Sequence, residues 1–359
     1  MNEPASTVQS VLTSVISAGK AAVRAIAPED IQRFIASRPG VTGPVTISQV
    51  RANSAVGASS GIVLFAARYD TGSGPIEREL VLRHAPGSDT RLFFEYDLAR
   101  QFKVQKALQD TGVPVPEPLW LDANGDFLGV SGYIMALVSG EVPNPSAFTK
   151  GPIASASAPD RRSMLEAVMR ALVGIHGTDC TSRGLGDFVM NAEGDSPLRK
   201  CINWYWQTWE WINQPEFARL VSVRRWLLER APAGGTTLMH GDSTLHNYMF
   251  SGTKLVAVLD WEMSCLGRPE ADLALQCVGN ELFAAPTGSG MLMPPSQEEW
   301  LALYASAGGR KLEHFDYFKK LTAYMVVVAI QSLQRNLSDE VRAAQAPYMM
   351  NRLWAMLES

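Results

Sequence analysis

The stretch Leu238-Met-His-Gly-Asp-Ser-Thr-Leu-His-Asn-Tyr-Met-Phe250, followed shortly by Val258-Leu-Asp-Trp-Glu262, contains the side chains on which the fold prediction depends. It holds an aspartate (Asp242), an asparagine five positions later (Asn247) and a second aspartate thirteen positions beyond that (Asp260). Carboxylate and amide oxygens are the hard ligands that Mg²⁺ prefers. If these three residues come together, the segment has the oxygen ligands and the additional carboxylate that a Mg²⁺-nucleotide site needs.

The residues between Asn247 and Asp260 predict how they come together. The β-type run 248–250 is followed by a Ser-Gly-Thr-Lys turn at 251–254 and by the apolar run 255–259. Two β runs around a glycine-containing turn of about four residues indicate a hairpin. Because a hairpin brings its two ends together, Asn247 and Asp260 should lie side by side at its open end, with the aspartate of the preceding loop nearby.

The composition is that of a globular enzyme-sized chain. With 359 residues, of which 46% are hydrophobic and 19% charged, it is long enough for about two domains. The net charge of −4 gives no sign of the basic face that nucleic-acid binding needs. Four widely spaced cysteines favour reduced thiols, Glu3 stands where a signal peptide would carry positive charge, and no apolar run reaches the length of about 18 residues that a membrane span needs. We therefore expect a cytoplasmic protein that does not contact a membrane; its oligomeric state is not predicted.

The hydrophobic pattern changes character twice along the chain. It predicts an N-terminal helical segment at 1–44, a β-rich lobe at 45–138 and a mostly helical lobe at 139–359. In the β-rich lobe we expect strands at 45–50, 62–69, 79–84, 120–121 and 133–138, with a helix at 90–109. In the helical lobe we expect helices at 160–177, 195–213, 215–231, 269–282, 297–307, 313–337 and 339–357.

His240-Gly-Asp242, together with Asn247 and Asp260, resembles the catalytic loop and metal-binding aspartate of kinases related to aminoglycoside phosphotransferase and choline kinase. These enzymes are small-molecule relatives of the protein kinases. The resemblance covers about residues 29–340 and implies an α+β, two-lobed protein-kinase-like fold, with a small antiparallel β lobe, a larger helical lobe and ATP bound between them. It implies transfer of the γ-phosphoryl group of ATP to a hydroxyl of a small molecule.

The resemblance also implies a role for each residue of the motif. Phosphoryl transfer requires positioning, charge neutralisation and an acceptor for the substrate's hydroxyl proton. Asp242 would take or orient that proton, and Asn247 and Asp260 would hold Mg²⁺. His240, placed with Asp242 in the catalytic group, would brace the loop through hydrogen bonds, and Asp272 in the later Gly-x-Pro-x-x-Asp segment would brace it as well. The alternative is an ordinary turn with an aspartate cap.

Gly57-Ala-Ser-Ser-Gly61 has two functional interpretations. Its letters match the G-x-S-x-G nucleophile elbow, which would make Ser59 an esterase nucleophile, but that elbow requires a helix after the serine. Here a predicted strand follows. The second interpretation is a loop in which Gly57, Ser59 and Ser60 let backbone N–H groups approach the phosphates of ATP. The resemblance supports this second interpretation, and a plain hairpin turn is the remaining one.

The rest of the implied nucleotide site lies in the predicted β-rich lobe. Where the kinase pattern has a lysine at the end of the third strand, this chain has Arg83, which keeps the charge but changes the geometry of phosphate binding. Glu95, expected on the following helix, would orient Arg83, and Val81 on the same strand face would pack on the adenine. The backbone of the hinge would hydrogen-bond the adenine, and its residues are Met135, Ala136 and Val138.

Two other functions stay open from the sequence. The departure at Arg83 allows a nucleotide-binding pseudokinase without transfer activity, although Asp242, Asn247 and Asp260 are all present. A metal-dependent hydrolase would use His240, His246 and Asp260 around Zn²⁺ or Mn²⁺.

The four tryptophans between Trp204 and Trp211 favour a helix packed in the core, with substrate stacking as the second possibility. No motif identifies the phosphorylated alcohol.

Overall fold

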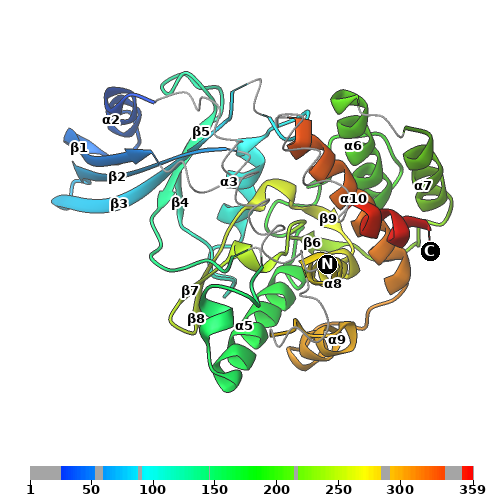
Figure 1. The fold of residues 1–359 in the computed structure, drawn as a ribbon. Helices are drawn as coiled ribbons and strands as arrows, with labels where there is room; N and C mark the ends of the chain where they lie inside the picture. The colour runs from blue at the N-terminus through cyan, green and yellow to red at the C-terminus, as the bar shows by residue number, and fades with distance from the viewer. Residues whose placement is uncertain are drawn as a thin grey trace, which may run out of the picture. The chain divides into compact units, whose positions relative to one another are not determined.

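The computed structural model describes residues 26–52, 60–87, 91–144, 146–213, 217–283, 292–335 and 350–358. These residues form two compact units (Figure 1). The β-rich unit comprises the described residues of Ile16–Lys106 and Pro116–Val138, and the helical unit those of Ala107–Val115 and Ser139–Ser359. The predicted division into segments 1–44, 45–138 and 139–359 stays a prediction, and residues 1–25 of the predicted N-terminal helical segment lie outside the described residues.

The β-rich unit is built on one five-stranded antiparallel sheet with the order β1-β2-β3-β5-β4. The central β2–β3 pair is in continuous register over ten residue pairs, and β5 pairs with the other edge of β3. All five predicted strands are therefore present. The elements of this unit are α2 (Pro28–Ala36), β1 (Thr42–Ala52), β2 (Gly61–Asp70), β3 (Pro75–His84), α3 (Leu98–Ala107), β4 (Pro118–Asp122) and β5 (Gly132–Ala136).

The two faces of this sheet are buried by different elements. Helix α2 begins at Pro28, whose fixed φ suits the first helical position, and it packs beside β1; its Phe34 is buried in the same hydrophobic cluster as Leu80 and Leu82 of β3. Val81 lies on the opposite face of β3, in a smaller cluster that includes Leu98 of α3. The period of two along β3 thus divides its side chains between two cores.

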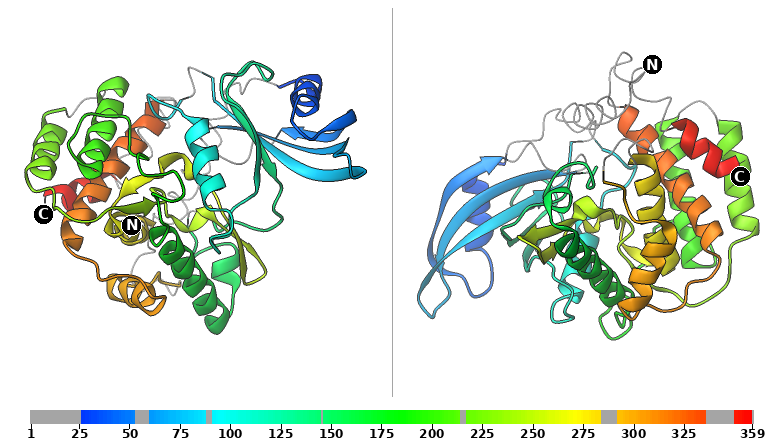
Figure 2. Two further views of the ribbon diagram at one scale, coloured as in Figure 1. Left: turned by 180° about the vertical axis from the view of Figure 1, so that it is seen from behind. Right: turned by 60° about the horizontal axis from the view of Figure 1, so that its bottom comes forward.

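The helical unit contains the predicted hairpin and nearly all of the predicted helices. Helix α5 has Ser157 as its N-cap, and α10 packs against both α8 and α6 (Figure 2). Residues 350–358 are helical as well, whereas 336–349 lie outside the described residues. The elements are α4 (Pro152–Ser155), α5 (Ala158–His176), α6 (Pro197–Ile212), α7 (Phe217–Glu229), β6 (Thr237–Met239), η2 (Leu245–Asn247), β7 (Tyr248–Ser251), β8 (Lys254–Val258), η3 (Trp261–Met263), β9 (Cys265–Gly267), α8 (Pro269–Phe283), α9 (Gln297–Ser306) and α10 (Phe315–Arg335).

The core of the helical unit explains the tryptophan-rich segment of α6. Trp204, Trp206 and Trp209 are buried, and Trp211 is the exposed member of the group at 36%. Helix α6 packs against α10, α7 and β9, so its aromatic side chains fill the centre of this unit. Searching the described helices for a segment long and apolar enough to cross a membrane finds none.

Candidate active site

The β7–β8 hairpin brings Asn247 and Asp260 to the same end. Tyr248 pairs with Val258, and beyond that pair the Leu259 N–H donates to the Asn247 carbonyl over 2.8 Å. Asp260 follows immediately and has a left-handed backbone, with φ 61° and ψ 68°. This conformation is uncommon outside glycine and is tolerated best by asparagine and aspartate. The residue type and the backbone turn at this position therefore agree.

Asn247 is held so that its side-chain oxygen is the atom left for a ligand. The side chain is almost fully buried, and its Nδ2 donates to the Asp242 carbonyl over 2.8 Å. Its backbone N–H donates to the Thr244 carbonyl over 3.0 Å, which closes the 3₁₀ turn η2. Since the amide nitrogen is engaged by the loop itself, the donor set that Asn247 and Asp260 can present to a cation consists of oxygens. That set fits Mg²⁺.

Asp242 is fixed at its backbone and at its carboxylate. Its N–H donates to His240 Nδ1 over 3.2 Å, and its carbonyl accepts from Asn247. One carboxylate oxygen, Oδ1, accepts a hydrogen bond of 2.8 Å from Thr244 Oγ1. The carboxylate is only partly buried, so it can reach a substrate.

His240 joins the Asp242 segment to the Asp260 segment. The ring is fully buried, and Nε2 donates to the Leu259 carbonyl over 2.8 Å while Nδ1 accepts from the Asp242 N–H. These contacts require the tautomer with its proton on Nε2. The rings of Tyr248 and Trp261 enclose it, with centroids 6.4 and 4.7 Å away. His240 is thus built into the frame of the site, as a bracing residue should be.

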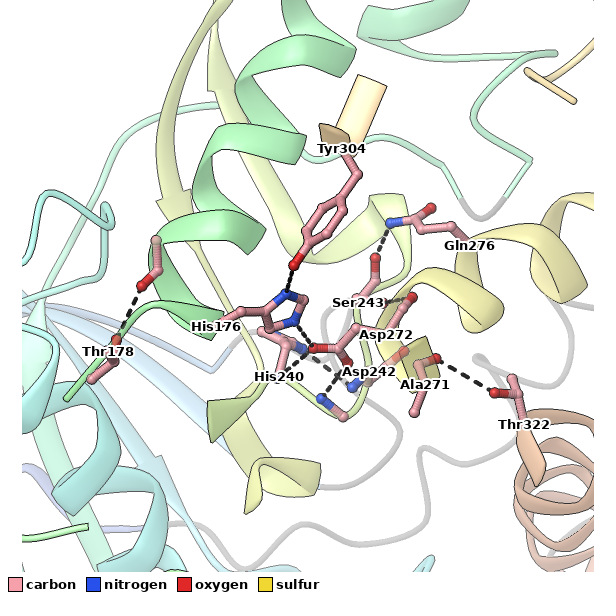
Figure 3. Close-up of polar contacts among 12 residues, drawn as sticks. His176, Thr178, His240, Asp242, Ser243, Ala271, Asp272, Gln276, Tyr304 and Thr322 are labelled. Carbon is pink, nitrogen blue, oxygen red and sulfur yellow. Dashed lines mark hydrogen bonds and ion pairs between the residues drawn. The ribbon is translucent and has the colours of Figure 1, made fainter. Parts of the chain in front are cut away.

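Asp272, in the first turn of α8, binds the backbone of the predicted catalytic loop, residues 240–247 (Figure 3). Oδ2 accepts from the His240 N–H and Oδ1 from the Gly241 N–H, both over 2.9 Å. His176 Nε2 donates to Oδ2 over 3.0 Å. Burial raises the pKa of Asp272, but the His176 hydrogen bond and the other nearby donors more than offset it, so the pKa lies below its ordinary value.

The next residues of the loop are held by the same helix. Ser243 Oγ donates to the Asp272 carbonyl over 2.6 Å, and the Gln276 amide donates to the Ser243 carbonyl (Figure 3). Gly241 has φ +82°, and a Cβ on it would collide with the Met263 carbonyl. Glycine is therefore required at this position by backbone conformation and by space.

His176 and Tyr304 are the parts of the site that the sequence did not reveal. His176 ends α5, Tyr304 belongs to α9, and His176 Nδ1 lies 2.9 Å from the Tyr304 hydroxyl (Figure 3). Burial raises the pKa of Tyr304 to about 12. His176 lies far from the catalytic loop in sequence and in no recognisable motif, so only the fold shows that it supports Asp272. Asp272 itself was predicted to brace the loop, and its contacts agree with that role.

In the β-rich unit, Arg83 and Val81 lie where the sequence places them, on one face of β3. Arg83 is buried and paired in register with Tyr133 of β5. Glu95 was expected on the helix after β3, and this is wrong: α3 begins at Leu98, and Glu95 belongs to the non-helical segment before it. The predicted helix at 90–109 is correspondingly shorter. Whether Glu95 orients Arg83 stays a prediction.

The other predicted nucleotide-binding residues divide into two groups. Gly57 and Ser59 lie outside the described residues, and Ser60 is buried just before β2. Met135 and Ala136 belong to β5 and Val138 follows it. The Ala136 N–H donates to the Glu117 carbonyl over 2.9 Å, and the Leu137 N–H donates to Glu79 over 3.0 Å. These two amides are therefore committed to the sheet.

The metal-hydrolase interpretation has little support in the geometry of the loop. Both nitrogens of His240 are engaged, and the lone pair on Nδ1 is used by the loop backbone. Over the ranges that the structure describes, no three His, Cys, Asp or Glu side chains gather as a metal site would require.

A cavity of about 430 Å³ in the helical unit does not include the catalytic loop; Phe148, Arg161, Leu165, Met293 and Leu303 are among its lining residues.

The antiparallel sheet of the β-rich unit, the helices of the helical unit, and the H-G-D loop followed by the β7–β8 hairpin define a protein-kinase-like phosphotransferase fold. Residues 66–318 match the phosphotransferase enzyme family (APH), and the chain belongs to this family. It is 30% identical over 286 residues to mouse (Mus musculus) acyl-CoA dehydrogenase family member 10, a match covering 75% of this chain. The chain spans only about a quarter (26%) of the length of that relative.

Solved structures show the same fold at low sequence identity. A protein from Ralstonia eutropha JMP134, provisionally named an aminoglycoside phosphotransferase, is 21% identical with a TM-score of 0.68; the match covers 93% of this chain and 99% of the other. Choline kinase LicA from Streptococcus pneumoniae is 14% identical with a TM-score of 0.52, covering 92% and 97%. LicA has also been solved in complex with AMP. The predicted family and the predicted fold class are confirmed.

Proposed function

We propose that the chain is an ATP- and Mg²⁺-dependent O-phosphotransferase that moves the γ-phosphoryl group of ATP to a hydroxyl of a small molecule. The observation that carries the proposal is the arrangement at the open end of the β7–β8 hairpin. There, the Leu259 N–H donates to the Asn247 carbonyl, which brings the backbone of Asn247 next to the residue before Asp260, and Asn247 Nδ2 donates to the Asp242 carbonyl. Membership of the phosphotransferase family supports it.

Each residue of the loop has one task in this proposal. Asp242 accepts or orients the proton of the acceptor's hydroxyl as the oxygen attacks phosphorus. Asn247 and Asp260 hold Mg²⁺, which neutralises charge on the phosphates when it is bound. His240 and Asp272 keep the loop backbone in place through the contacts described above. Such preorganisation matters because phosphoryl transfer depends mainly on positioning and electrostatic stabilisation.

For the β-rich unit we assign Arg83 to the nucleotide phosphates and Val81 to the adenine ring. Because the amides of Ala136 and Leu137 donate within the sheet, the hinge amide that we assign to the adenine is that of Val138. The complex of LicA with AMP supports adenine nucleotide as the phosphoryl donor of this fold. Gly57, Ser59 and Ser60 keep their predicted contact with the phosphates.

The names of related proteins suggest an order in which acceptors should be tested. The mouse relative is named as an acyl-CoA dehydrogenase family member, and it is longer than this chain by a large additional segment. A kinase joined to such a protein would act on a hydroxyl that an acyl thioester carries. We therefore place hydroxyacyl thioesters first among the acceptors to test, ahead of choline and aminoglycosides, which the structural neighbours indicate.

An ADP-release screen with Mg²⁺-ATP and a panel of hydroxyacyl thioesters, amino alcohols and aminoglycosides tests the proposal. We expect turnover with at least one class, and we expect Asp242→Asn to lower kcat by about 10²–10⁴, the usual scale for losing a positioned base. Wild-type turnover by the Asn variant would show that Asp242 does not have this role. ATP binding by calorimetry and ATP hydrolysis, each measured with and without Mg²⁺, together separate a kinase from the pseudokinase alternative, which would bind nucleotide and turn over no acceptor.

A further inference from the structure

Thr244 stands at a capping position, yet its side chain does not cap. It is the residue before the 3₁₀ turn η2, with φ −62° and ψ 147°, and its hydroxyl makes no bond to the backbone of that turn. A threonine at such a position ordinarily accepts from a backbone N–H two or three residues later. Here the hydroxyl lies 2.8 Å from Asp242 Oδ1 instead. The turn is closed without it, by the Asn247 N–H and the Thr244 carbonyl.

The direction of this hydrogen bond determines the role of His246. An ionised carboxylate only accepts, so the single proton of the Thr244 hydroxyl is donated to Asp242. His246 Nε2 lies 3.1 Å from the same hydroxyl oxygen, and it must therefore be the donor in that contact. The geometry assigns His246 the tautomer with its proton on Nε2. The hydrogen bond from His246 therefore orients the Thr244 hydroxyl so that its proton points at the Asp242 carboxylate.

This chain of donors decides which carboxylate oxygen faces the reaction. The backbone of Asp242 is already fixed by His240 and Asn247, which leaves rotation of the carboxyl group as the remaining freedom. Thr244 occupies Oδ1, and within the described part of the chain Oδ2 receives no hydrogen bond. A base must present an unoccupied lone pair to the proton that it takes, in an orientation already set.

We propose that Thr244, oriented by His246, is a positioning residue that holds the Asp242 carboxylate so that Oδ2 faces the hydroxyl of the acceptor. The inference rests on the proposed function, because it gives Asp242 the role of base. It adds two residues that lie outside the Asp242, Asn247 and Asp260 constellation. Neither of them touches the reacting atoms; Thr244 acts through Asp242, and His246 acts through Thr244.

Kinetics of paired variants measure the first link. Thr244→Val removes the hydroxyl at nearly constant volume, and we expect kcat to fall about 10- to 100-fold, as for loss of a hydrogen bond to a charged group, with the KM for ATP unchanged. Thr244→Ser keeps the hydroxyl and should restore most of the rate. The matched control is Thr149→Val, whose hydroxyl bonds only the Ser146 carbonyl, at 2.9 Å, and whose kcat should not change.

The contact between His246 and Thr244 predicts that the losses of kcat in the two single variants will not be additive in free energy. His246→Leu removes the closer donor to the Thr244 hydroxyl and leaves the longer contact of 3.5 Å from Asn247 Nδ2, so it should lower kcat about two- to tenfold, the range for one neutral hydrogen bond. Because His246 acts through Thr244, the double variant T244V/H246L should be no slower than T244V alone. Independent, multiplying losses would overturn the coupling. Unchanged kcat in T244V, with thermal unfolding confirming a folded protein, would overturn the positioning role while leaving the proposed function standing.

A structural readout tests the same proposal without any acceptor. In [¹⁵N]histidine-labelled protein, the signals of His246 can be identified because they are absent from His246→Gln. We expect proton coupling at Nε2 in the wild type, and a changed chemical shift or tautomer mixture in Thr244→Val. A proton on Nδ1 in the wild type, or identical spectra in the two proteins, would overturn the proposal. Failure to find any phosphorylated acceptor would instead count against the proposed function.

Discussion

The catalytic loop of the helical unit and strand β3 of the β-rich unit carry different parts of the proposed chemistry, and they are held in place differently. Strand β3 is regular, and paired strands fix it on both edges over consecutive residues. The loop has no regular backbone. Asp272, His176 and Gln276, which come from two helices, hold it through side chains.

Because the two regions are held in place differently, they should respond differently to substitution. A residue of β3 can change its side chain and leave the main-chain ladder intact, so Arg83 can be tested for function alone. In the loop, the backbone amides of His240 and Gly241 depend on one buried carboxylate. Removing that carboxylate leaves buried donors without acceptors, a cost in stability as well as in rate.

The largest effect that separates the two regions is expected for Asp272→Asn. An amide cannot accept from both backbone N–H groups and from His176, so buried donors lose their partner. We expect the free energy of unfolding to fall by about 3–5 kcal/mol at neutral pH, the range for breaking a buried charged pair. Urea unfolding followed by circular dichroism measures it.

The matched control for this variant is Asp195→Asn. The side chain of Asp195 is 76% exposed and its Arg199 partner is 3.4 Å away. We expect a change within about 0.5 kcal/mol, as for most surface substitutions. Equal losses in the two variants would mean that Asp272 is no more than an ordinary surface-type carboxylate for stability.

The pH dependence of unfolding tests whether the ionised carboxylate of Asp272 is what stabilises the fold. The folded state lowers the pKa of Asp272, so this group stabilises the fold fully above the unfolded carboxyl pKa of about 4 and loses its effect as pH falls through the folded value. The stability difference between wild type and Asp272→Asn should therefore shrink as acid is added below about pH 4. A constant difference down to about pH 2 would show that ionisation of Asp272 is not involved.

The sequence predicted β3 and the motif of the loop for different reasons. A strand can be predicted from a local period of two, which placed Arg83 on β3. The β7–β8 hairpin can be predicted from its turn residues and from the spacing of the two β runs, which placed Asn247 and Asp260 at its ends. The helix expected to carry Glu95 was drawn too long, because the apolar spacing before Leu98 resembles a helix although the chain there is not helical. Pattern alone does not locate that start.

The support of the loop could be predicted only in part. Asp272 was found through its Gly-x-Pro-x-x-Asp segment, which lies close by in sequence. His176 and Tyr304 are 128 residues apart from each other, and their contact arises from the packing of α5 against α9. A single histidine at the end of an apolar helix has no local signal for such a role. Tertiary contacts of this kind need the fold.

A smaller effect is expected in the strand. Arg83→Gln should raise the KM for ATP about 10- to 100-fold, the range for one hydrogen bond to a charged group, with the unfolding free energy less affected than in Asp272→Asn. Arg83→Lys should fall between, because lysine keeps the charge and loses the bidentate geometry. Initial rates at varied ATP concentration provide the measurement.

Arg78 gives the strand its own control. It lies on β3 at an even position, on the face opposite to Arg83, and pairs with Glu117 over 2.6 Å at the surface. Arg78→Gln should leave the KM for ATP as it is. If Arg83→Gln behaves in the same way, Arg83 serves the core of the β-rich unit and the nucleotide phosphates are bound by other groups.

The smallest effect on stability and rate is expected for Tyr304, which reaches the loop only through His176 and Asp272. Tyr304→Phe removes the hydroxyl that contacts His176 and should cost about 1 kcal/mol of stability, the net value of one hydrogen bond, with kcat reduced severalfold at most. The matched control is Tyr317→Phe, whose hydroxyl donates to the Leu227 carbonyl over 2.9 Å, away from the loop. It should cost similar stability and leave kcat unchanged.

Alkaline unfolding adds a readout specific to Tyr304. The folded state raises its pKa to about 12, so its contribution is complete below the ordinary tyrosine value of about 10 and is lost as pH rises from there to about 12. The stability advantage of the wild type over Tyr304→Phe should fall to zero within that interval and then change sign, because about two pKa units outweigh the contribution of one hydrogen bond. If both tyrosine variants kept full kcat, the contact of Tyr304 with His176 would not be needed for the rate, and Asp272, His176 and Gln276 would be enough to hold the loop. The loop would then differ from strand β3 only through the side chains that contact the loop or its Asp272 carboxylate directly, and Tyr304 would not belong to its support.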